Sequence, residues 1–567
     1  DHGAGRGRCP FVQPMPPLKN MSKTLHPSSS VPLRLSVVSL AGCLACLTGT
    51  AAMAQTAAPA VASASDALPA GTPAASGTPP AQWRVRGFSV IGDNPLGSTE
   101  TLLVMAPFLR SELSLDTLQQ ATSALEARLQ AKGHALHRVV LPPQEVTETL
   151  TLQVVKFAIG KVNVEGAGEF GEANIRRSLP ELQEGGTPHF HALAVQTALA
   201  NDNPAKQVQV ALKASDDNPD LIDATVRVQA APPLQWSASL SNTGTASTGR
   251  DRLSLVGSHA NLFERDHQLS VAYTTSLARP SDVRQVGLTY RVPFYTVGGM
   301  LDASFTDSNV VGQFGTFTST GAGRTAGLSY THHYGTEDGL TRFAVVGLED
   351  KVFNPVQLNG IPLAGQQQRR SRPLTLSYRA KQQTDTAYWD AGVSLSTNLS
   401  GGGGNHLQAY QSERPAVTTT RWQALRFQGG RVDSLPGGWL MGWRGQGQWA
   451  STALIAGEQF GLGGTGNLRG AGERVLSADS GLSTSLEFTA PEWPNGIRPL
   501  AFVDAGWLRG RQSNSDSAAS VGLGLRYARG SLALALDYGR IVKGSRVSLA
   551  QNPSTNAPQR GDHKLHL

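Results

Sequence analysis

The sequence GLGGTGNLRGAGERVLSADSG, residues 461–481, interrupts a run of strand-like segments and carries Arg469 near its centre. Glycine accepts positive φ and has no side chain, so this stretch can fold back as a hairpin and approach other backbone closely. Downstream, the alternation of 501–507 places Phe502, Asp504 and Gly506 on one face of a strand. An arginine on this loop and an aspartate on the polar face of the strand suggest a latch inside a barrel. These residues alone favour the other interpretation, a surface loop with a solvated arginine, and the rest of the chain decides between the two.

The composition of the whole chain fits a barrel in a membrane. The 567 residues include 62 glycines, and only 16% are charged, while 40% are hydrophobic. Soluble domains carry about 25% charged residues. A transmembrane β-barrel has a polar lumen face that dilutes its apolar residues, which suits these values. The length predicts two to four structural units.

The net charge of +7 does not indicate a nucleic-acid partner. Residues 1–54 hold five basic residues against one acid, a local +4 that leaves +3 for the rest of the chain. Without a basic patch, nucleic acid is excluded as the expected partner. Cys9, Cys43 and Cys46 also lie in this segment, so we expect no disulfide or zinc–thiolate site after it.

Residues 1–54 show the pattern of an upstream extension and a signal peptide. From Met21, the expected start, basic residues precede an apolar run at 35–47, and the small-x-small sequence Ala52-Met53-Ala54 follows. We expect cleavage between Ala54 and Gln55. A lipoprotein cleavage box ending at Cys43 is the alternative interpretation. Residues 55–82 are rich in Ala, Pro, Ser and Thr, which predicts a linker.

Residues 83–156 and 157–232 read as two copies of a small α/β unit. In the first copy, 115–132 is an amphipathic helix with Ser114 as N-cap and Gly133 as its stop. The order strand, two helices, strand, strand then recurs in the second copy. A tandem duplication of a βααββ unit explains both copies; the alternative is a pair of generic α/β domains.

From 233 to 567 short alternating segments replace helical periodicity, and many end in tyrosine, as in an interfacial girdle. About 10 residues per tilted membrane strand, with as many per connection, predict about sixteen antiparallel strands. An even number of strands also suits a closed barrel without edges. A soluble β-sandwich or propeller array is the competing interpretation.

No enzyme motif is present, since the chain lacks GxSxG, HExxH and the P-loop. His332 and His333 are neighbours on a strand and point to opposite faces, so one metal ion is not expected to bind both. We predict no catalytic residue, no metal site and no cofactor.

With this order of segments, residues 82–567 resemble the outer-membrane transporters of two-partner secretion (TpsB), the haemolysin and filamentous-haemagglutinin secretion/activation family. The paired small units resemble the family's POTRA domains. The local matches are Phe88-Ser-Val-Ile-Gly92, Val140-Leu-Pro-Pro-Gln144, Asn242-Thr-Gly244 and Tyr290-Arg-Val-Pro293, and the most specific are Leu468-Arg-Gly470 and Phe502-Val-Asp-Ala-Gly506.

The resemblance implies that Arg469 and Gly470 form the tip of a lumen loop that engages Asp504, flanked by Phe502 and Gly506. It also implies an outer-membrane location in a Gram-negative bacterium, with the POTRA domains in the periplasm. There they would capture an unfolded secreted exoprotein, which the barrel would pass outward without ATP. The barrel assembly machinery and outer-membrane lipid are the other implied partners.

The sequence departs from the family pattern at three places. Ala471 follows the Arg-Gly pair where an aromatic is frequent, the chain ends at Leu567 rather than an aromatic, and 55–82 offers no obvious plug helix. Two other functions stay open, a barrel assembly factor and a passive porin.

Overall fold

The computed structural model describes residues 85–109, 114–145, 148–245, 248–310, 312–314, 317–319, 322–337, 339–355, 357–358, 361–362, 364–511, 515–547 and 556–567. The predicted signal peptide, its cleavage residues Ala52, Ala54 and Gln55, and the predicted linker lie outside these residues.

The first α/β unit contains a three-stranded sheet in the order β1-β3-β2, with β1 parallel to β3 and β2 antiparallel to it. Its elements are β1 (Gly87–Gly92), α2 (Ser98–Met105), η1 (Ala106–Phe108), α3 (Leu115–Ala131), β2 (His137–Val140) and β3 (Thr149–Lys156). The predicted helix is confirmed, since Ser114 Oγ accepts the Thr117 N–H at 3.3 Å and Gly133 follows with φ +90°. Leu115 is exposed, because it opens the first turn before the apolar face meets the sheet.

The second α/β unit repeats this arrangement with the sheet order β4-β6-β5, again with its first strand parallel to its last. Its elements are β4 (Ala158–Glu165), η2 (Gly168–Phe170), α4 (Gly171–Ser178), α5 (Phe190–Asn201), β5 (Lys206–Ala214) and β6 (Leu221–Ala230). The same order of elements and the same strand order in both units confirm the predicted βααββ repeat. In each sheet the middle strand is the last one, so each outer strand pairs with one strand among the described residues. The outer edge of β4 is occupied at Ile159, whose N–H and carbonyl bond to the backbone of Gly186 and Gly185 at 2.8 and 2.7 Å.

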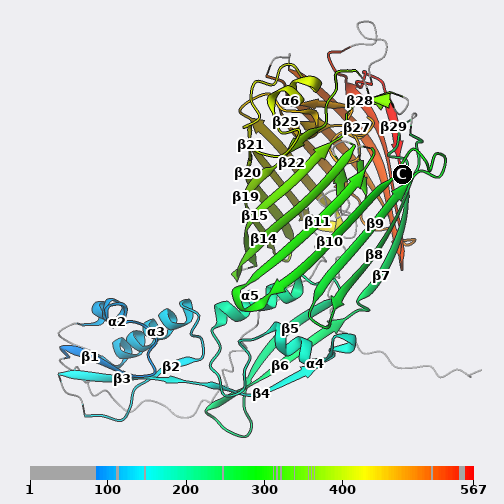
Figure 1. Ribbon diagram of the computed structural model, residues 1–567. Helices are drawn as coiled ribbons and strands as arrows, with labels where there is room; N and C mark the ends of the chain where they lie inside the picture. Colours follow the sequence, from blue (N-terminus) through cyan, green and yellow to red (C-terminus); the bar gives the residue numbers. More distant parts are fainter. Residues whose placement is uncertain are drawn as a thin grey trace, which may run out of the picture. The chain divides into compact units, whose positions relative to one another are not determined.

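Sixteen antiparallel strands form the barrel in the described residues, counting β18 and β19 as one because both pair with β15 (Figure 1). They are β7 (Leu234–Ser241), β8 (Arg252–Leu262), β9 (His267–Thr275), β10 (Gln285–Phe294), β11 (Gly299–Ser308), β14 (Gly323–Glu337), β15 (Leu340–Phe353), β18 (Arg369–Ser371), β19 (Pro373–Gln383), β20 (Ala387–Asn398), β21 (Gln423–Ser434), β22 (Leu440–Ala450), β25 (Ser480–Thr489), β26 (Ile497–Arg509), β27 (Asp516–Arg529), β28 (Leu532–Lys543) and β29 (His563–His566). The predicted barrel of about sixteen strands is confirmed.

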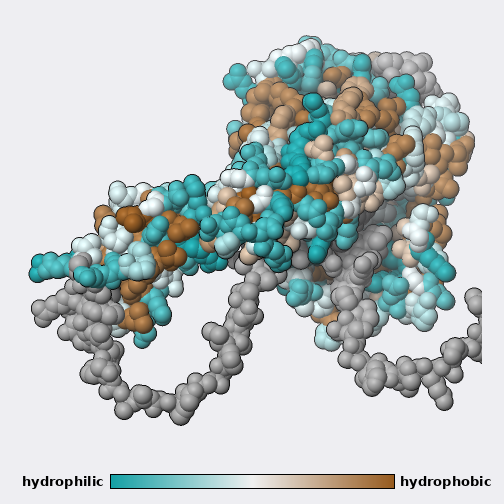
Figure 2. All heavy atoms as spheres, turned by 90° about the horizontal axis from the view of Figure 1, so that it is seen from below, coloured by the Kyte–Doolittle hydropathy of each residue, from teal (hydrophilic) through white to brown (hydrophobic). Residues whose placement is uncertain are grey.

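The outer wall of the barrel is apolar, as the alternating pattern predicts. Leu523, Leu376 and Leu328 are each more than half exposed, and Tyr378 and Tyr538 also face outward. Figure 2 shows hydrophobic side chains gathered on this wall. In a membrane barrel, apolar residues that face outward alternate with polar residues that face the lumen. The apolar outer wall is therefore the surface that contacts lipid.

Several short elements lie between the barrel strands. They are η3 (Tyr295–Val297), β12 (Gly312–Phe314), β13 (Phe317–Ser319), β16 (Gln357–Leu358), β17 (Ile361–Pro362), α6 (Leu407–Glu413), η4 (Pro436–Gly438), η5 (Ala456–Glu458), β23 (Phe460–Leu462) and β24 (Leu476–Ala478). The sequence did not predict α6, whose N-terminus is capped by His406 Nδ1 at 3.3 Å from the Ala409 nitrogen. Among the described helices, none has the length and apolar character needed to cross a membrane.

Candidate functional site in the barrel lumen

The glycine-rich stretch lies inside the barrel. It leaves β22 and returns as β25, and between these strands β23 and β24 pair with each other. Its apolar side chains pack against inward-facing residues of β26, β27 and β28. This cluster contains Leu462, Leu468, Ala471 and Ala478 from the loop, with Leu508, Ala518 and Ile541 from the wall. The loop therefore has an apolar core of its own within the lumen.

Arg469 is held by β26 in a bidentate contact. Its Nε donates to Asp504 Oδ2 at 2.8 Å, and its Nη2 donates to Asp504 Oδ1 at 2.9 Å. The backbone N–H of Arg469 donates to the same carboxylate at 3.0 Å. Arg469 is 1% exposed and Asp504 is fully buried. Arg469 is thus a desolvated ion-pair partner, and the interpretation as a solvated surface arginine is wrong.

The guanidinium of Arg469 has three further contacts. Its Nη1 donates to Glu487 Oε2 at 2.8 Å, and its Nη2 donates to Ser485 Oγ at 3.1 Å. The Phe502 ring lies beneath the guanidinium, with its centroid 3.4 Å from the central carbon. A planar guanidinium can make this fork and this stacking contact together, whereas a lysine ammonium cannot.

Gly470 and Gly506 are needed because other atoms occupy the space of a side chain. Gly470 has φ +97°, and a Cβ placed there would lie 2.9 Å from the Gly539 carbonyl carbon. A Cβ on Gly506 would lie 2.3 Å from Leu462 of the loop. The wall is therefore shaped to receive the loop, and the loop tip is shaped to fit the wall.

Four polar residues of this site were missed by the sequence reasoning: Ser485, Glu487, Asp537 and His566. His566 Nε2 accepts the Gly470 N–H at 3.0 Å, and Asp537 Oδ2 lies 3.7 Å from Arg469 Nη1. Ser485 pairs directly with Asp504 across β25 and β26. Alternation alone could have placed these side chains in the lumen, but only the strand register brings them to Arg469.

Both ends of the loop are anchored by buried carboxylates. Before the loop, Glu458 accepts the Ser371 hydroxyl at 2.7 Å and lies 3.3 Å from Arg426 Nη2. At its far end, Asp479 is fully buried and pairs with Arg414, which follows α6. These anchors belong to the barrel wall and to the segment around α6, so the loop base is fixed independently of Arg469.

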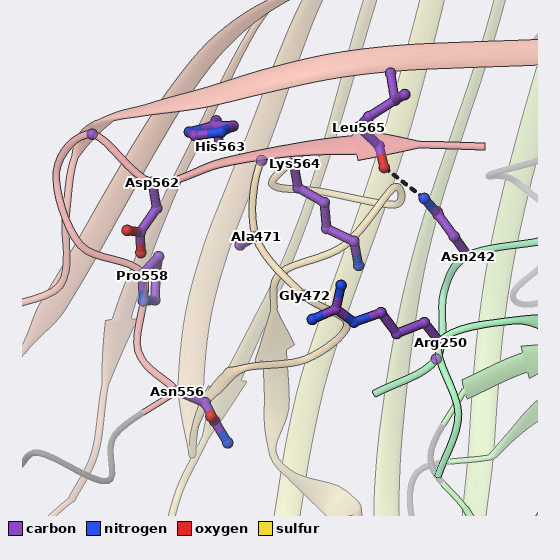
Figure 3. Close-up of a pocket in the computed structure, with 13 residues that line it drawn as sticks. Asn242, Arg250, Ala471, Gly472, Asn556, Pro558, Asp562, His563, Lys564 and Leu565 are labelled. Carbon is purple, nitrogen blue, oxygen red and sulfur yellow. Dashed lines mark hydrogen bonds between the residues drawn. The ribbon is translucent and has the colours of Figure 1, made fainter. Parts of the chain in front are cut away.

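A cavity of 690 Å³ lies between the loop tip and the first and last strands (Figure 3). Its lining includes Gly472 of the loop, and Figure 3 shows Arg250 and Lys564 extending toward each other beside it. At this seam the Asn242 side chain donates to the Leu565 carbonyl at 2.6 Å and accepts the Leu567 N–H at 3.1 Å. The loop tip thus lies against the place where the barrel closes.

The described residues contain no group of three or more histidine, cysteine or acidic side chains placed to hold a metal ion. His332 and His333 point apart. The His333 Nε2 lies 3.4 Å from Asp202 of the second α/β unit, whereas the His332 ring stacks with Tyr330.

Comparison with known families gives two matches. A family described as haemolysin secretion/activation protein ShlB/FhaC/HecB matches residues 222–527, and the ShlB-type POTRA domain matches residues 83–156. Among curated proteins, the outer membrane transporter CdiB of Escherichia coli is 24% identical over 468 residues, which span 79% of this chain and 76% of that protein. CdiB of Dickeya dadantii is 21% identical over 442 residues.

The solved structures that share this fold include two CdiB proteins. CdiB from Escherichia coli superposes with a TM-score of 0.68 at 18% identity, covering 87% of this chain and 91% of that one. CdiB from Acinetobacter baumannii gives a TM-score of 0.65 at 17% identity, covering 87% and 90% of the two chains.

Proposed function

Because the chain belongs to the haemolysin secretion/activation family ShlB/FhaC/HecB, we propose that it carries one unfolded exoprotein of haemolysin, haemagglutinin or adhesin type through its barrel. The family and its relatives are outer-membrane transporters, and their POTRA domains lie in the periplasm. In this proposal the two α/β units capture the exoprotein, the barrel conducts it outward, and no ATP is consumed.

The observation that supports conduction is the way in which the lumen loop is held. Its hairpin of β23 and β24 forms a separate two-stranded sheet, and neither strand pairs with a barrel strand within the described residues. The loop can therefore move without breaking the hydrogen bonds that close the wall. Arg469 and Asp504 join the loop tip to β26, so their contact has to open before the tip can leave the wall. We assign them the role of a latch.

Capture is supported by the outer edge of β5 in the second unit. This strand pairs only with β6 among the described strands. The Asn201 side chain bonds to the N–H and the carbonyl of Val208 on the outer edge at 2.6 and 3.1 Å, so the part of the edge that can accept a peptide begins after Val208. An unpaired edge can accept an extended peptide as an added strand, through backbone hydrogen bonds that require little of the peptide's sequence. An unfolded exoprotein offers this kind of segment.

The proposal predicts that a neighbouring reading frame encodes the exoprotein, as a large repetitive protein with its own signal peptide, and the test uses that protein. Cells that express both proteins should release the exoprotein into the medium, and deletion of 83–232 should abolish the release. The barrel of the deletion variant must still give a heat-modifiable band in the outer membrane. Undiminished release by the deletion variant would refute capture by these units.

Energy use is tested separately. Purified full-length protein in lipid vesicles should take up the unfolded exoprotein segment in the absence of nucleotide. Uptake that requires ATP would refute the last part of the proposal. Insertion of other barrels by the purified protein, with no transport, would favour the alternative of an assembly factor.

A further inference from the structure

A buried ion pair joins the second POTRA-type unit to the barrel. The Lys206 Nζ donates to Asp266 Oδ2 at 2.7 Å, and each of the two residues is 1% exposed. Lys206 is the first residue of β5, and Asp266 lies in the turn between β8 and β9. This turn is on the periplasmic side, because β7 directly follows the second unit in the chain and β8, antiparallel to β7, returns to the same end of the barrel.

Residues from both sides form further hydrogen bonds with the pair. Lys206 Nζ also donates to Asn174 Oδ1 at 2.9 Å, and Asp266 Oδ2 accepts the Tyr295 hydroxyl at 2.6 Å. Asn174 donates in turn to Asn261 Oδ1 at 3.2 Å. Burial lowers the pKa of Lys206, and the charge of Asp266 opposes this effect. Buried charges are retained when partners of this kind satisfy them.

The turn that carries Asp266 has an unusual backbone. Phe263, Glu264 and Asp266 all have positive φ, at 59°, 58° and 60°. Left-handed conformations are costly for residues with a Cβ and persist where the surroundings fix them. The second unit supplies this support, since Asn174 Nδ2 and Arg177 Nη1 donate to the Glu264 carbonyl at 3.0 and 2.7 Å.

The pair therefore fixes the root of an edge strand at the barrel entrance. Ala260 and Tyr295 of the barrel pack against the apolar core of the second unit. Apolar contacts of this kind hold the unit against the barrel but do not fix one orientation. A buried ion pair fixes the register, because any shift leaves a buried charge unpaired. From Lys206, β5 runs outward to its exposed end at Ala214.

We propose that Lys206 and Asp266 are positioning residues that hold the free edge of β5 in line with the barrel entrance, so that a cargo segment added to β5 is directed into the lumen. This inference rests on the proposed capture function. It adds the residues that couple capture to conduction.

The test measures the joint directly and needs no cargo. Spin labels are placed at Gln209→Cys on β5 and Asn495→Cys in a periplasmic turn of the full-length protein in lipid nanodiscs. Both positions are exposed, and the three native cysteines all precede residue 47. We expect one narrow distance distribution for the parent protein, and a distribution at least twice as wide for Lys206→Met and for Asp266→Asn.

Lys161→Gln is the matched control, because Lys161 makes an exposed ion pair with Asp217 in the same unit. Its distribution should stay narrow. Tyr295→Phe removes one hydrogen bond to Asp266 and should widen the distribution to a smaller extent. This milder variant tests the proposal even if the charge variants fail to fold. Unchanged widths in the variants that fold, or equal widening in Lys161→Gln, would overturn the proposal.

The link to transport is measured on the same variants with the neighbouring exoprotein. Lys206→Met should still retain the exoprotein on the POTRA units but should lose most of its release into the medium. If the parent protein neither retains nor releases the exoprotein, the proposed function fails, while the distance measurement still decides the positioning role. If Lys206→Met releases it at the parent level, the positioning inference fails and the proposed function stands.

Discussion

Arg469 is the buried arginine that joins the tip of the lumen loop to the barrel wall. Its side chain bonds to Asp504 on β26 and to Ser485 and Glu487 on β25, and it stacks on Phe502. Removing one partner of a desolvated ion pair costs about 3–5 kcal/mol, because the remaining charge stays buried without its counterion. The loss of one partner of an exposed pair costs only about 0–1 kcal/mol. Because both groups are buried, we expect the loss of Arg469 or of Asp504 to fall in the range for desolvated pairs.

Arg469→Ala and Asp504→Ala should each reduce exoprotein release strongly while the barrel still inserts. The double variant should be little worse than either single variant, because both singles already break the same latch. Arg469→Lys should be intermediate, since lysine keeps the charge but loses the fork and the stacking. Release per inserted barrel is the measurement. Arg498→Ala, which breaks a more exposed pair with Glu492, is the control, and additive losses in the double variant would contradict the latch.

Gly470 tests the fit of the loop tip to the wall. Gly470→Ala forces a Cβ at positive φ against the backbone of Gly539 and should destabilise the docked loop by about 1–3 kcal/mol. Gly466→Ala is the matched control in the same loop, because no atom lies within 4 Å of its Cβ position. Protease cleavage of the loop in the intact barrel measures the difference. Equal cleavage of the two variants would show that the tip does not need its glycine.

The sequence indicates some of these residues and not others, for a physical reason. Alternation along 501–507 places Asp504 inward, and the glycines allow the loop to enter the lumen. The proximity of Glu487 and His566 depends on strand register, which arises from the stagger of the whole barrel rather than from local pattern. Lys206 was missed for another reason, since a lysine at the start of a strand is normally exposed.

At the scale of elements, the joint between the two α/β units contains three histidines. The His134 ring lies 5.3 Å from His137 and 5.1 Å from His189 of the second unit, centroid to centroid. Gly133 leaves room for the His189 ring, and its carbonyl accepts the Phe190 N–H at 2.8 Å. The βααββ pattern was predictable from caps and periodicity, whereas this contact depends on how the two units meet.

Burial, followed by the charge of a neighbouring histidine, lowers the pKa of His134 and of His137. For His137, Asp93 acts in the opposite direction and Lys156 in the same direction. A released histidine titrates near 6.5, so below that pH protons favour the undocked units. The joint should be fully stable above about pH 6.5 and should weaken as the pH falls toward the lowered pKa values.

Hydrogen exchange of the Phe190 N–H in the full-length protein measures this weakening. Its protection factor, corrected for intrinsic exchange, should fall between pH 7.5 and pH 5.0, while that of Val226 in the core of the second unit should not. His134→Gln should reduce the fall, whereas His191→Gln, at the periphery of the cluster, should leave it unchanged. A protection factor that does not depend on pH would contradict the role of the cluster.

At the scale of the whole molecule, the lumen loop and the predicted linker are the two candidate obstructions of the pore. The loop packs within the lumen on residues of three strands. The linker sequence at 55–82 holds five prolines and Asp66 as its only ionisable residue, so it offers no amphipathic face to bind a polar lumen. Conductance should therefore depend on the loop and not on the linker.

Two deletions separate these contributions in single-channel recordings. Excision of 464–472 joins Gly463 to Glu473, which are already close because the Arg474 N–H donates to the Gly463 carbonyl at 3.2 Å. This deletion removes the loop tip with Arg469 and should raise conductance severalfold. Deletion of 56–78 should leave conductance nearly unchanged. A large rise on the linker deletion would reveal a plug in that segment, and no rise on the loop excision would mean that the loop does not narrow the conducting path.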